Sequence, residues 1–206
     1  MNNERDENQS NEKKTHKNAL RSRFRAIRQA LDPSLRRTET IATVAVLSSY
    51  VKAHANRPLA SYLALPDELD LAELHHFWWS LKRSLWLPRV SGPSTLTWHV
   101  FIDENSVVHG TTPGSFGIRE PDPARIPAQM LPSNATVLVP GLAFTRDGQR
   151  LGQGKGFYDR VLSTHQGHTI GIGYRCQQAE HLPTEPHDQS VAMVVLGGEP
   201  YGKDGK

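Results

Sequence analysis

The sequence predicts an α/β fold, a three-layer α/β/α arrangement around a mostly parallel central sheet. In several segments apolar residues recur at helical spacing, and short apolar runs of strand length lie between those segments. Helices and strands that alternate in this way are typical of parallel sheets covered on both faces. The 206 residues suit one domain, which we expect to cover residues 17–198.

Polar segments flank the expected domain. Residues 1–16 have no apolar core and include several acidic residues, so they match neither a secretory signal nor an organelle transit peptide. We interpret them as a disordered leader and residues 199–206 as a polar tail. A single cysteine, Cys176, fits a reducing compartment, and no apolar run approaches the roughly 20 residues needed to span a bilayer. The sequence therefore predicts a cytoplasmic protein.

Two helices are expected at the start of the domain. Asp32-Pro33 matches an N-cap followed by proline at the first helical position, so it separates the two helices. The first helix is indicated by an apolar stripe of Leu20, Phe24, Ile27 and Leu31, and the second by Ile41, Val44, Leu47 and Val51.

The rest of the domain alternates between strands and helices. Asp70 and Glu73 have capping-box spacing at the start of a third helix. Residues 110–127 are rich in glycine and proline and predict an irregular connection. The expected strands cover residues 58–65, 84–90, 96–102, 135–139, 169–174 and 191–196, and the remaining helices cover residues 71–82 and 157–164.

A glycine-rich loop, residues 148–156, joins a buried strand directly to a helix. Glycines permit positive φ and close approach of a ligand to the backbone, and the helix start offers N–H groups to an anion. Arg150 and Lys155 add positive charge, and Asp159 is placed to share a Mg²⁺ with a phosphate. The loop matches neither a Walker A nor a dinucleotide motif. A surface turn with solvated charges is the alternative interpretation.

Residues 139–162, VPGLAFTRDGQRLGQGKGFYDRVL, resemble the signature of the 5-formyltetrahydrofolate cyclo-ligase family. The similarity extends over about residues 17–196, and one departure is Gln153, where the family is expected to carry an aromatic or basic residue. Further blocks similar to that family occur in the same order at residues 17–21, 66–69, 87–89, 116–121, 171–177 and 182–188.

The resemblance implies an ATP- and Mg²⁺-dependent ligase of folate and one-carbon metabolism. Such an enzyme converts 5-formyltetrahydrofolate into 5,10-methenyltetrahydrofolate and releases ADP and phosphate, after phosphorylation of the formyl oxygen. Positioning and charge stabilisation are the main demands of that chemistry on the protein. The implied partners are the folate and ATP, without nucleic acid or membrane, and the implied state is a monomer.

The resemblance also assigns residues to roles. Lys155 and Arg150 would be catalytic, and Asp159 and Asp188 would bind Mg²⁺. ATP would contact Lys17, Arg21, Arg150, Leu151, Gly152, Gln153, Gly154, Lys155, Gly156, Phe157 and Tyr158. The folate would contact Leu63, Glu68, Gln153, Gly154, Lys155, Gly156 and Phe157.

Simpler interpretations of these residues stay open at this stage. Lys17 and Arg21 also fit a solvated basic helix face, Asp188 a cap or turn, and the two aromatic residues at 157–158 ordinary packing. The chain as a whole could instead be a non-catalytic folate or nucleotide binder of the same fold. Its net charge of +3 also suits a nucleic-acid binder, although the arginine-rich first helix lacks interleaved aromatic residues and any known reading motif.

Overall fold

The computed structural model of the chain describes residues 2–114 and 117–202, with side chains from residue 13 onward. Its helices are α1 (Asn2–Gln29), α2 (Pro33–Ala53), α3 (Ala72–Ser80), α4 (Glu104–Gly110) and α5 (Phe157–Thr164), followed by the short 3₁₀ helix η2 (Arg175–Gln177). Its strands are β1 (Leu59–Ala60), β2 (Leu85–Val90), β3 (Leu96–Phe101), β4 (Thr111–Pro113), β5 (Arg119–Pro121), β6 (Ala128–Gln129), β7 (Thr136–Pro140), β8 (Ala143–Phe144), β9 (Arg150–Leu151), β10 (Thr169–Gly173), β11 (Met193–Leu196) and β12 (Glu199–Gly202).

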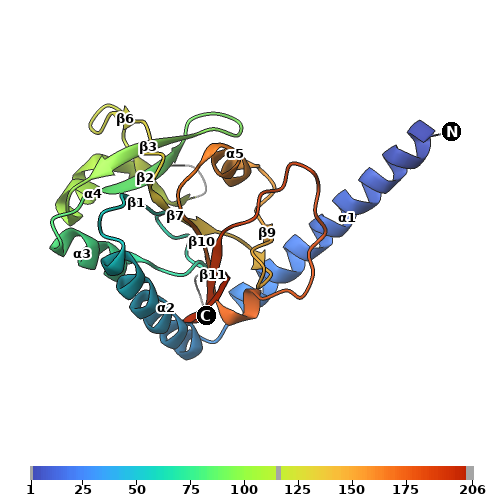
Figure 1. Cartoon of the computed structure of the whole chain (residues 1–206), viewed down its shortest axis with the longest axis horizontal. Helices are drawn as coiled ribbons and strands as arrows, with labels where there is room; N and C mark the ends of the chain where they lie inside the picture. The colour runs from blue at the N-terminus through green and yellow to red at the C-terminus, as the bar shows by residue number, and fades with distance from the viewer. Residues whose placement is uncertain (1, 115–116, 203–206) are drawn as a thin grey trace.

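An eight-stranded sheet in the order β12-β11-β10-β7-β1-β2-β3-β6 forms the centre of the molecule (Figure 1). The strands from β11 to β2 pair in parallel, whereas β12, β3 and β6 add antiparallel edges. The chain first builds outward from β1 to β3 and later places β7, β10 and β11 on the other side of β1. The order of the strands therefore reverses between β1 and β7, and open α/β sheets bind ligands at the carboxyl ends of strands at such a point.

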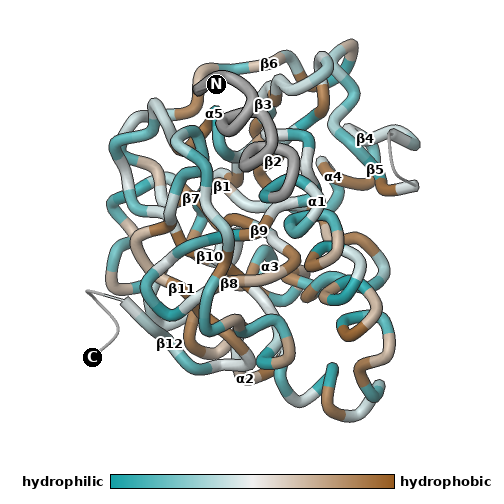
Figure 2. The backbone as a smooth tube through the Cα atoms, turned by 90° about the vertical axis from the view of Figure 1, so that its right-hand side faces the viewer, coloured by the Kyte–Doolittle hydropathy of each residue, from teal (hydrophilic) through white to brown (hydrophobic). Residues whose placement is uncertain are grey.

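Helices cover both faces of the sheet, which confirms the predicted three layers. On one face Leu47 of α2 and Trp78 of α3 pack in a cluster that includes Leu138 of β7. On the other face α5 packs against a second cluster, which includes Val137 and Val139 of the same strand. Successive strand residues point to opposite faces, so β7 contributes to both clusters. Apolar residues accordingly concentrate on the strands inside the molecule (Figure 2).

Helix α1 is longer than the sequence predicts. It runs back to Asn2, and its first turns project away from the body of the molecule (Figure 1), where the sequence predicts a disordered leader of residues 1–16. That segment contains neither glycine nor proline and many good helix formers, so it can extend a helix that packing of the later turns already stabilises. The packed part includes Phe24, which lies with Leu142 and Leu182 in a third apolar cluster.

The buried face of α2 differs from the predicted stripe. Leu47 and Val51 are buried as expected, but Ile41 is 61% exposed, and Glu39 and Thr43 are buried instead. The Glu39 carboxylate accepts a hydrogen bond from the backbone N–H of Arg175 at 2.8 Å. This polar contact with the segment after β10 turns the side of α2 that carries Glu39 toward the interior. The spacing of apolar residues alone does not reveal that orientation.

The caps of the helices agree only in part with the predictions. Asp32 caps α2 and accepts from the N–H groups of Ser34 and Leu35, as predicted. At α3 the predicted capping box is wrong, because the N-cap is Leu71 and Asp70 accepts only from the N–H of Ala72 at 3.0 Å.

Several segments form structure that the sequence did not predict, among them α4, the β4–β5 hairpin and β12. Helix α4 carries a capping box between Asp103 and Ser106. Within the predicted irregular connection, β4 and β5 form a two-stranded hairpin. The predicted polar tail begins with β12, which pairs with β11. Conversely, the strand predicted over residues 58–65 is limited to β1. Within the described ranges, no helix is both long enough and apolar enough to cross a membrane.

Candidate active site

A cavity of about 470 Å³ opens at the carboxyl ends of β1, β2 and β7, where the order of the strands reverses. Helix α1, the segment after β1, the end of β2, residues 118–120 and the glycine loop surround it. Its lining includes Arg25, Arg28, Tyr62, Leu63, Leu65, Asp67, Glu68, Pro88, Val90, Leu96, Ile118, Glu120, Pro140, Gly141, Arg150, Gly152, Gln153, Gly154, Lys155, Gly156, Phe157, Tyr158 and Asp159. We refer to this cavity as the crevice.

The glycine loop forms one wall of the crevice. Its first residues belong to the β8–β9 hairpin, which the sequence did not predict, and it enters α5 at Gly156, the N-cap of that helix with φ of 69°. Gly154 has φ of 95°, a left-handed conformation that side chains rarely adopt. The loop is held from outside by Arg21, whose Nε donates to the carbonyl of Gly152 at 3.1 Å. Its backbone geometry therefore depends on glycine and on contact with α1.

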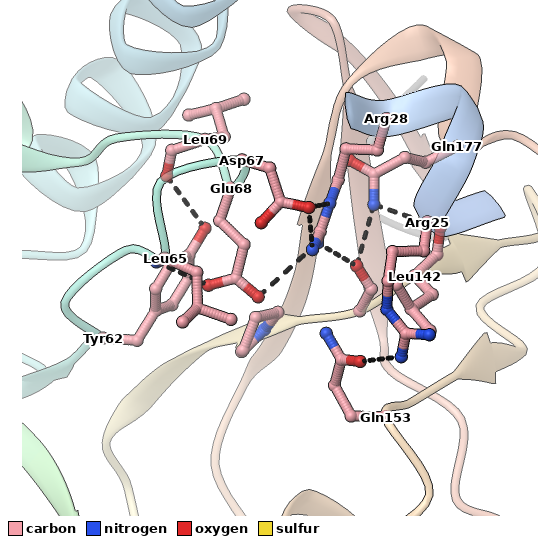
Figure 3. Close-up of polar contacts among 12 residues, drawn as sticks. Arg25, Arg28, Tyr62, Leu65, Asp67, Glu68, Leu69, Leu142, Gln153 and Gln177 are labelled. Carbon is pink, nitrogen blue, oxygen red and sulfur yellow. Dashed lines mark hydrogen bonds and ion pairs between the residues drawn. The ribbon is translucent and has the colours of Figure 1, made fainter. Parts of the chain in front are cut away.

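Four of the cations on helix α1 are Lys17, Arg21, Arg25 and Arg28. Arg21 and Arg25 contact the loop, Arg28 lines the crevice, and Lys17 contacts the segment before β11. They are spaced by four, four and three residues, which places them on one side of the helix. Arg25 donates from Nη2 to Oε1 of Gln153 at 2.8 Å (Figure 3). Lys17 is only 4% exposed, so the alternative of a solvated basic face is wrong for that residue.

Lys17 connects α1 to the segment before β11. Its ammonium donates to Oδ2 of Asp188 at 2.6 Å and also to the carboxylate of Glu185. The hydrogen bond from Lys17 is the main reason that the pKa of Glu185 is lowered. Ligand atoms of Glu185, His187 and Asp188 all lie within 4.8 Å of one another. Asp188 also accepts from the N–H of Glu185 at 2.7 Å, so it stabilises a turn as well.

Arg150 and Asp159 form an ion pair on the crevice wall. Nη2 of Arg150 donates to Oδ1 of Asp159 at 2.8 Å, and the two side chains are 4% and 20% exposed. The Nε of Arg150 is buried and has no hydrogen-bond partner among the described residues. An unsatisfied buried donor beside a cavity is well suited to an acceptor on a ligand.

The structure brings most of the predicted site residues together. Arg150, Asp159, residues 152–158, Leu63 and Glu68 all line the crevice. Lys17, Arg21 and Asp188 lie outside the crevice lining; Arg21 contacts the glycine loop, and Lys17 and Asp188 pair with each other. Leu151 was predicted to contact ATP, but its side chain is 2% exposed and packs in the cluster of Phe24. It therefore anchors the loop to the core.

The aromatic residues at the start of α5 were expected either to contact a ligand or to pack in the core, and their positions allow both. Phe157 and Tyr158 line the crevice, and Tyr158 also packs against the core on the α5 face. Burial raises the pKa of the Tyr158 hydroxyl, and the charge of Glu68 raises it further. Tyr158 therefore remains a neutral phenol at ordinary pH.

Sequence reasoning missed several residues at the site. Arg28, Tyr62 and Asp67 line the crevice opposite the glycine loop (Figure 3), and Glu185 pairs with Lys17. The spacing of Arg28 from Lys17 on the same helix side was a usable signal. The partners Asp67 and Glu185 lie 39 and 168 residues away from their cations, so no local pattern reveals those contacts.

Residues 13–197 match the model of the 5-formyltetrahydrofolate cyclo-ligase family. The chain belongs to this family. A 5-formyltetrahydrofolate cyclo-ligase of Haemophilus influenzae is 33% identical over 148 residues, which cover 68% of this chain and 75% of the relative. The enzyme of the same name from Escherichia coli K12 is 29% identical over 181 residues, covering 84% and 95%. The predicted family is thus confirmed.

A solved structure supports the fold of this cyclo-ligase family member. The NMR structure of a 5,10-methenyltetrahydrofolate synthetase from Aquifex aeolicus superimposes with a TM-score of 0.73 at 28% identity. The match covers 90% of this chain and 92% of the synthetase. The α/β architecture predicted for the cyclo-ligase domain is therefore shared with a solved member of the group.

Asp159, on the crevice wall, and Asp188, outside it, each offer a carboxylate oxygen of the kind that a divalent cation binds. The hydrogen bonds that the structure shows use Oδ1 of Asp159 and Oδ2 of Asp188, so each carboxylate has a second oxygen left for a metal ion. Mg²⁺ prefers a few carboxylate oxygens together with phosphate oxygens and water. Lys17 lies beside Asp188 and Arg150 beside Asp159, so each carboxylate has a neighbouring cation that could bind a phosphate.

Proposed function

We propose that this chain catalyses the ATP-dependent cyclisation of 5-formyltetrahydrofolate to 5,10-methenyltetrahydrofolate, with release of ADP and phosphate. The observation that supports it most is the crevice itself. One wall is a cationic glycine loop at a helix start, suited to a nucleotide triphosphate. The opposite wall carries a buried carboxylate, Glu68, among apolar and aromatic side chains, suited to a polar ring system.

The reaction requires activation of a poor electrophile. The oxygen of the formyl group carried by N5 attacks the γ-phosphorus of ATP. The bond between the γ-phosphorus and the β–γ bridging oxygen breaks, and ADP leaves. The N10 amine then attacks the activated formyl carbon and loses its proton, and inorganic phosphate departs as the five-membered ring closes. Each step gathers negative charge on phosphoryl oxygens, so positioned cations lower its barrier.

Residues of the loop supply these cations. Lys155 lies on the crevice wall, where it contacts the transferred phosphoryl group, and Arg150 offers its unpaired Nε from the same wall. Lys17 and Arg21 bind the remaining phosphates from α1. Asp159 and Asp188 would hold Mg²⁺, which neutralises phosphate charge when bound. We further propose that the protein is a cytoplasmic monomer.

The folate lies against the opposite wall. Leu63 and Phe157 provide apolar contact, and Glu68 provides a hydrogen-bonding carboxylate. Backbone groups of residues 153–156 lie between the two substrates, so both contact the same loop. This arrangement places the formyl oxygen beside the γ-phosphate and supplies the proximity that the reaction needs.

The experiment is an absorbance assay for the methenyl product with 5-formyltetrahydrofolate, ATP and Mg²⁺. We expect product only when ATP is present, and ¹⁸O placed in the formyl group should appear in the inorganic phosphate. Product without transfer of the label would contradict phosphorylation of the formyl oxygen. Tight binding of both ligands without product would instead support the non-catalytic binder.

Replacement of the loop lysine separates catalysis from stability. Lys155→Ala should lower kcat by about a hundredfold, because loss of one preorganised charge contact typically costs 10²–10³. The melting temperature should change little, since Lys155 is exposed and makes no ion pair among the described residues. Lys52→Ala, at an exposed position in the last turn of α2, is the matched control. Parallel losses of activity and stability in Lys155→Ala would contradict the assigned role.

A further inference from the structure

Arg28 is buried where three walls of the crevice meet. Its side chain comes from α1 and the residue is 1% exposed. Nε and Nη2 donate to Oδ2 of Asp67 at 3.0 and 2.8 Å, and Nη1 lies 3.5 Å from Oε1 of Glu68 (Figure 3). Nη1 also donates to the carbonyl of Gly141 at 3.4 Å, just after β7. One guanidinium thus joins α1, the segment after β1 and the end of β7.

The same contacts fix the position of Glu68. Its Oε1 faces Arg28 and its Oε2 accepts from the N–H of Leu65 at 3.1 Å, while the backbone carbonyl accepts from the hydroxyl of Tyr174 at 3.2 Å. The side chain is 9% exposed and lines the crevice. Its rotamer is therefore determined by α1 and by its own turn before any ligand binds.

Burial and charge act on Glu68 in opposite directions. Burial favours the neutral carboxyl and is the main cause of a raised pKa, and the neighbouring charge of Asp67 adds to it. The hydrogen bond from the N–H of Leu65 lowers the pKa most, and the charge and hydrogen bond of Arg28, the neighbouring cation, lower it further. The phenols of Tyr62, which is buried after β1, and of Tyr158, which is half-buried on α5, also lie near the carboxyl, and the raised pKa of each keeps it neutral at ordinary pH. The hydroxyl of Tyr174 faces the backbone carbonyl of Glu68, and Arg119, Glu120 and Arg150 line the same crevice.

The protonation state of Glu68 matters for a folate. The reduced pterin ring presents two adjacent donors, an N3–H and a 2-amino group. An ionised carboxylate accepts from both, whereas a protonated carboxyl carries a donor of its own and loses one of the two hydrogen bonds. A buried carboxyl without a nearby cation would therefore recognise the ring poorly near neutral pH.

We propose that Arg28 is the positioning residue for folate recognition, acting through Glu68, which it keeps ionised and directed into the crevice. This inference rests on the proposed function, because it takes the folate as the ligand of Glu68. The planar fork of arginine suits the task, since it contacts Asp67 with two nitrogens while a third faces Glu68 and Gly141. Arg28 itself need not contact either substrate.

The test compares Arg28→Met and Arg28→Lys in the full chain, with Arg23→Met as control, because Arg23 is an exposed arginine of the same helix. In Arg28→Met the acidic limb of the kcat/KM profile for the folate should move up by about one pH unit or more. The KM for the folate should rise at least tenfold, and the KM for ATP should stay within twofold. Arg28→Lys keeps the charge, so its acidic limb should lie close to that of the wild type while its folate KM rises.

The inference would be overturned if the acidic limb of the kcat/KM profile stayed in place in Arg28→Met. It would also be overturned if the KM for the folate and the KM for ATP rose equally. If Arg28→Met does not fold, Glu68→Gln and the Arg28→Lys/Glu68→Gln double variant decide. Glu68→Gln should remove the acidic limb, and the lysine change should then add no further loss in folate KM. Additive losses would count against action through Glu68.

A measurement without substrates keeps this inference separate from the proposed function. The Glu68 carboxyl carbon can be followed by ¹³C NMR in the ligand-free chain, with Glu68→Gln used for assignment. Its titration should move to higher pH in Arg28→Met, or in Arg28→Gln if the methionine variant does not fold. An unchanged titration overturns the inference even in an active enzyme, whereas a shifted titration in an inactive wild type would contradict the proposed function alone.

Discussion

Two buried cations at the site are paired with partners from distant segments. Lys17 pairs with Glu185 and Asp188, and Arg28 pairs with Asp67. The sequence pointed to Lys17 and Asp188 separately through the family resemblance, but it did not show that they contact each other. Such pairs depend on the tertiary fold, so residue types can be predicted where contacts cannot.

A buried histidine should make stability depend on pH. His75 lies 2.8 Å through Nε2 from Oγ of Ser61, and burial lowers its pKa from 6.5 to about 3. Between these values the unfolded chain binds the proton and the folded chain does not. The free energy of unfolding should therefore fall as pH drops from 6.5 toward 3, by up to about 1.4 kcal/mol per pH unit from this group.

Urea unfolding of His75→Gln at pH 5, 6 and 7 tests this contribution. The variant should be less stable than the wild type at pH 7, because it alters a buried hydrogen bond, but its stability should change less with pH. His181→Gln, at an exposed position, should keep the dependence of the wild type. Identical slopes in His75→Gln and the wild type would contradict the assignment.

At the scale of elements, two predictions match the structure closely. The helix predicted at residues 157–164 and the strand predicted at 169–174 match α5 and β10 closely. The apolar run at 58–65 misled, because only β1 pairs in the sheet, whereas Tyr62, Leu63 and Leu65 line the crevice. A run of apolar residues looks the same whether it faces a core or a cavity.

The glycine loop provides a prediction at this scale. Alanine at position 154 must adopt φ of 95°, and its Cβ would lie 3.3 Å from the guanidinium carbon of Arg21. Strain of roughly 1–2 kcal/mol should displace the loop. The kcat/KM for ATP should then fall about tenfold, since 1.4 kcal/mol corresponds to a factor of ten.

Gly92→Ala is the matched control for that change. Gly92 lies between β2 and β3, where an added Cβ would meet nothing closer than 3.6 Å. Activity with ATP should be unaffected there. Equal activity of Gly154→Ala and the wild type would show that the loop conformation is unimportant for the nucleotide.

At the scale of the whole molecule, the alternation of helices and strands was sufficient to predict a three-layer α/β domain. Strand order was not predictable, because it depends on where each crossover lands rather than on any single segment. The position of the crevice follows from that order, since it lies where β1 and β7 are neighbours. The glycine loop could be recognised in the sequence, but the wall opposite it could not.

Two truncations of α1 test which part of this helix the activity requires. Its first turns project from the body of the molecule (Figure 1). The family match begins at residue 13. Removal of residues 1–12 should leave turnover within about twofold and the melting temperature nearly unchanged. Removal of residues 1–22 also deletes Lys17 and Arg21, so turnover should fall by more than tenfold. Equal activity of the two truncated chains would contradict a nucleotide-binding role for α1.

A crystal structure of the chain with 5-formyltetrahydrofolate and a non-hydrolysable ATP analogue tests the central claim most directly. We expect the phosphates against the backbone of residues 152–156 and Lys155, with the pterin ring against Glu68 in the same crevice. A triphosphate bound elsewhere, with the glycine loop free of ligand, would contradict it.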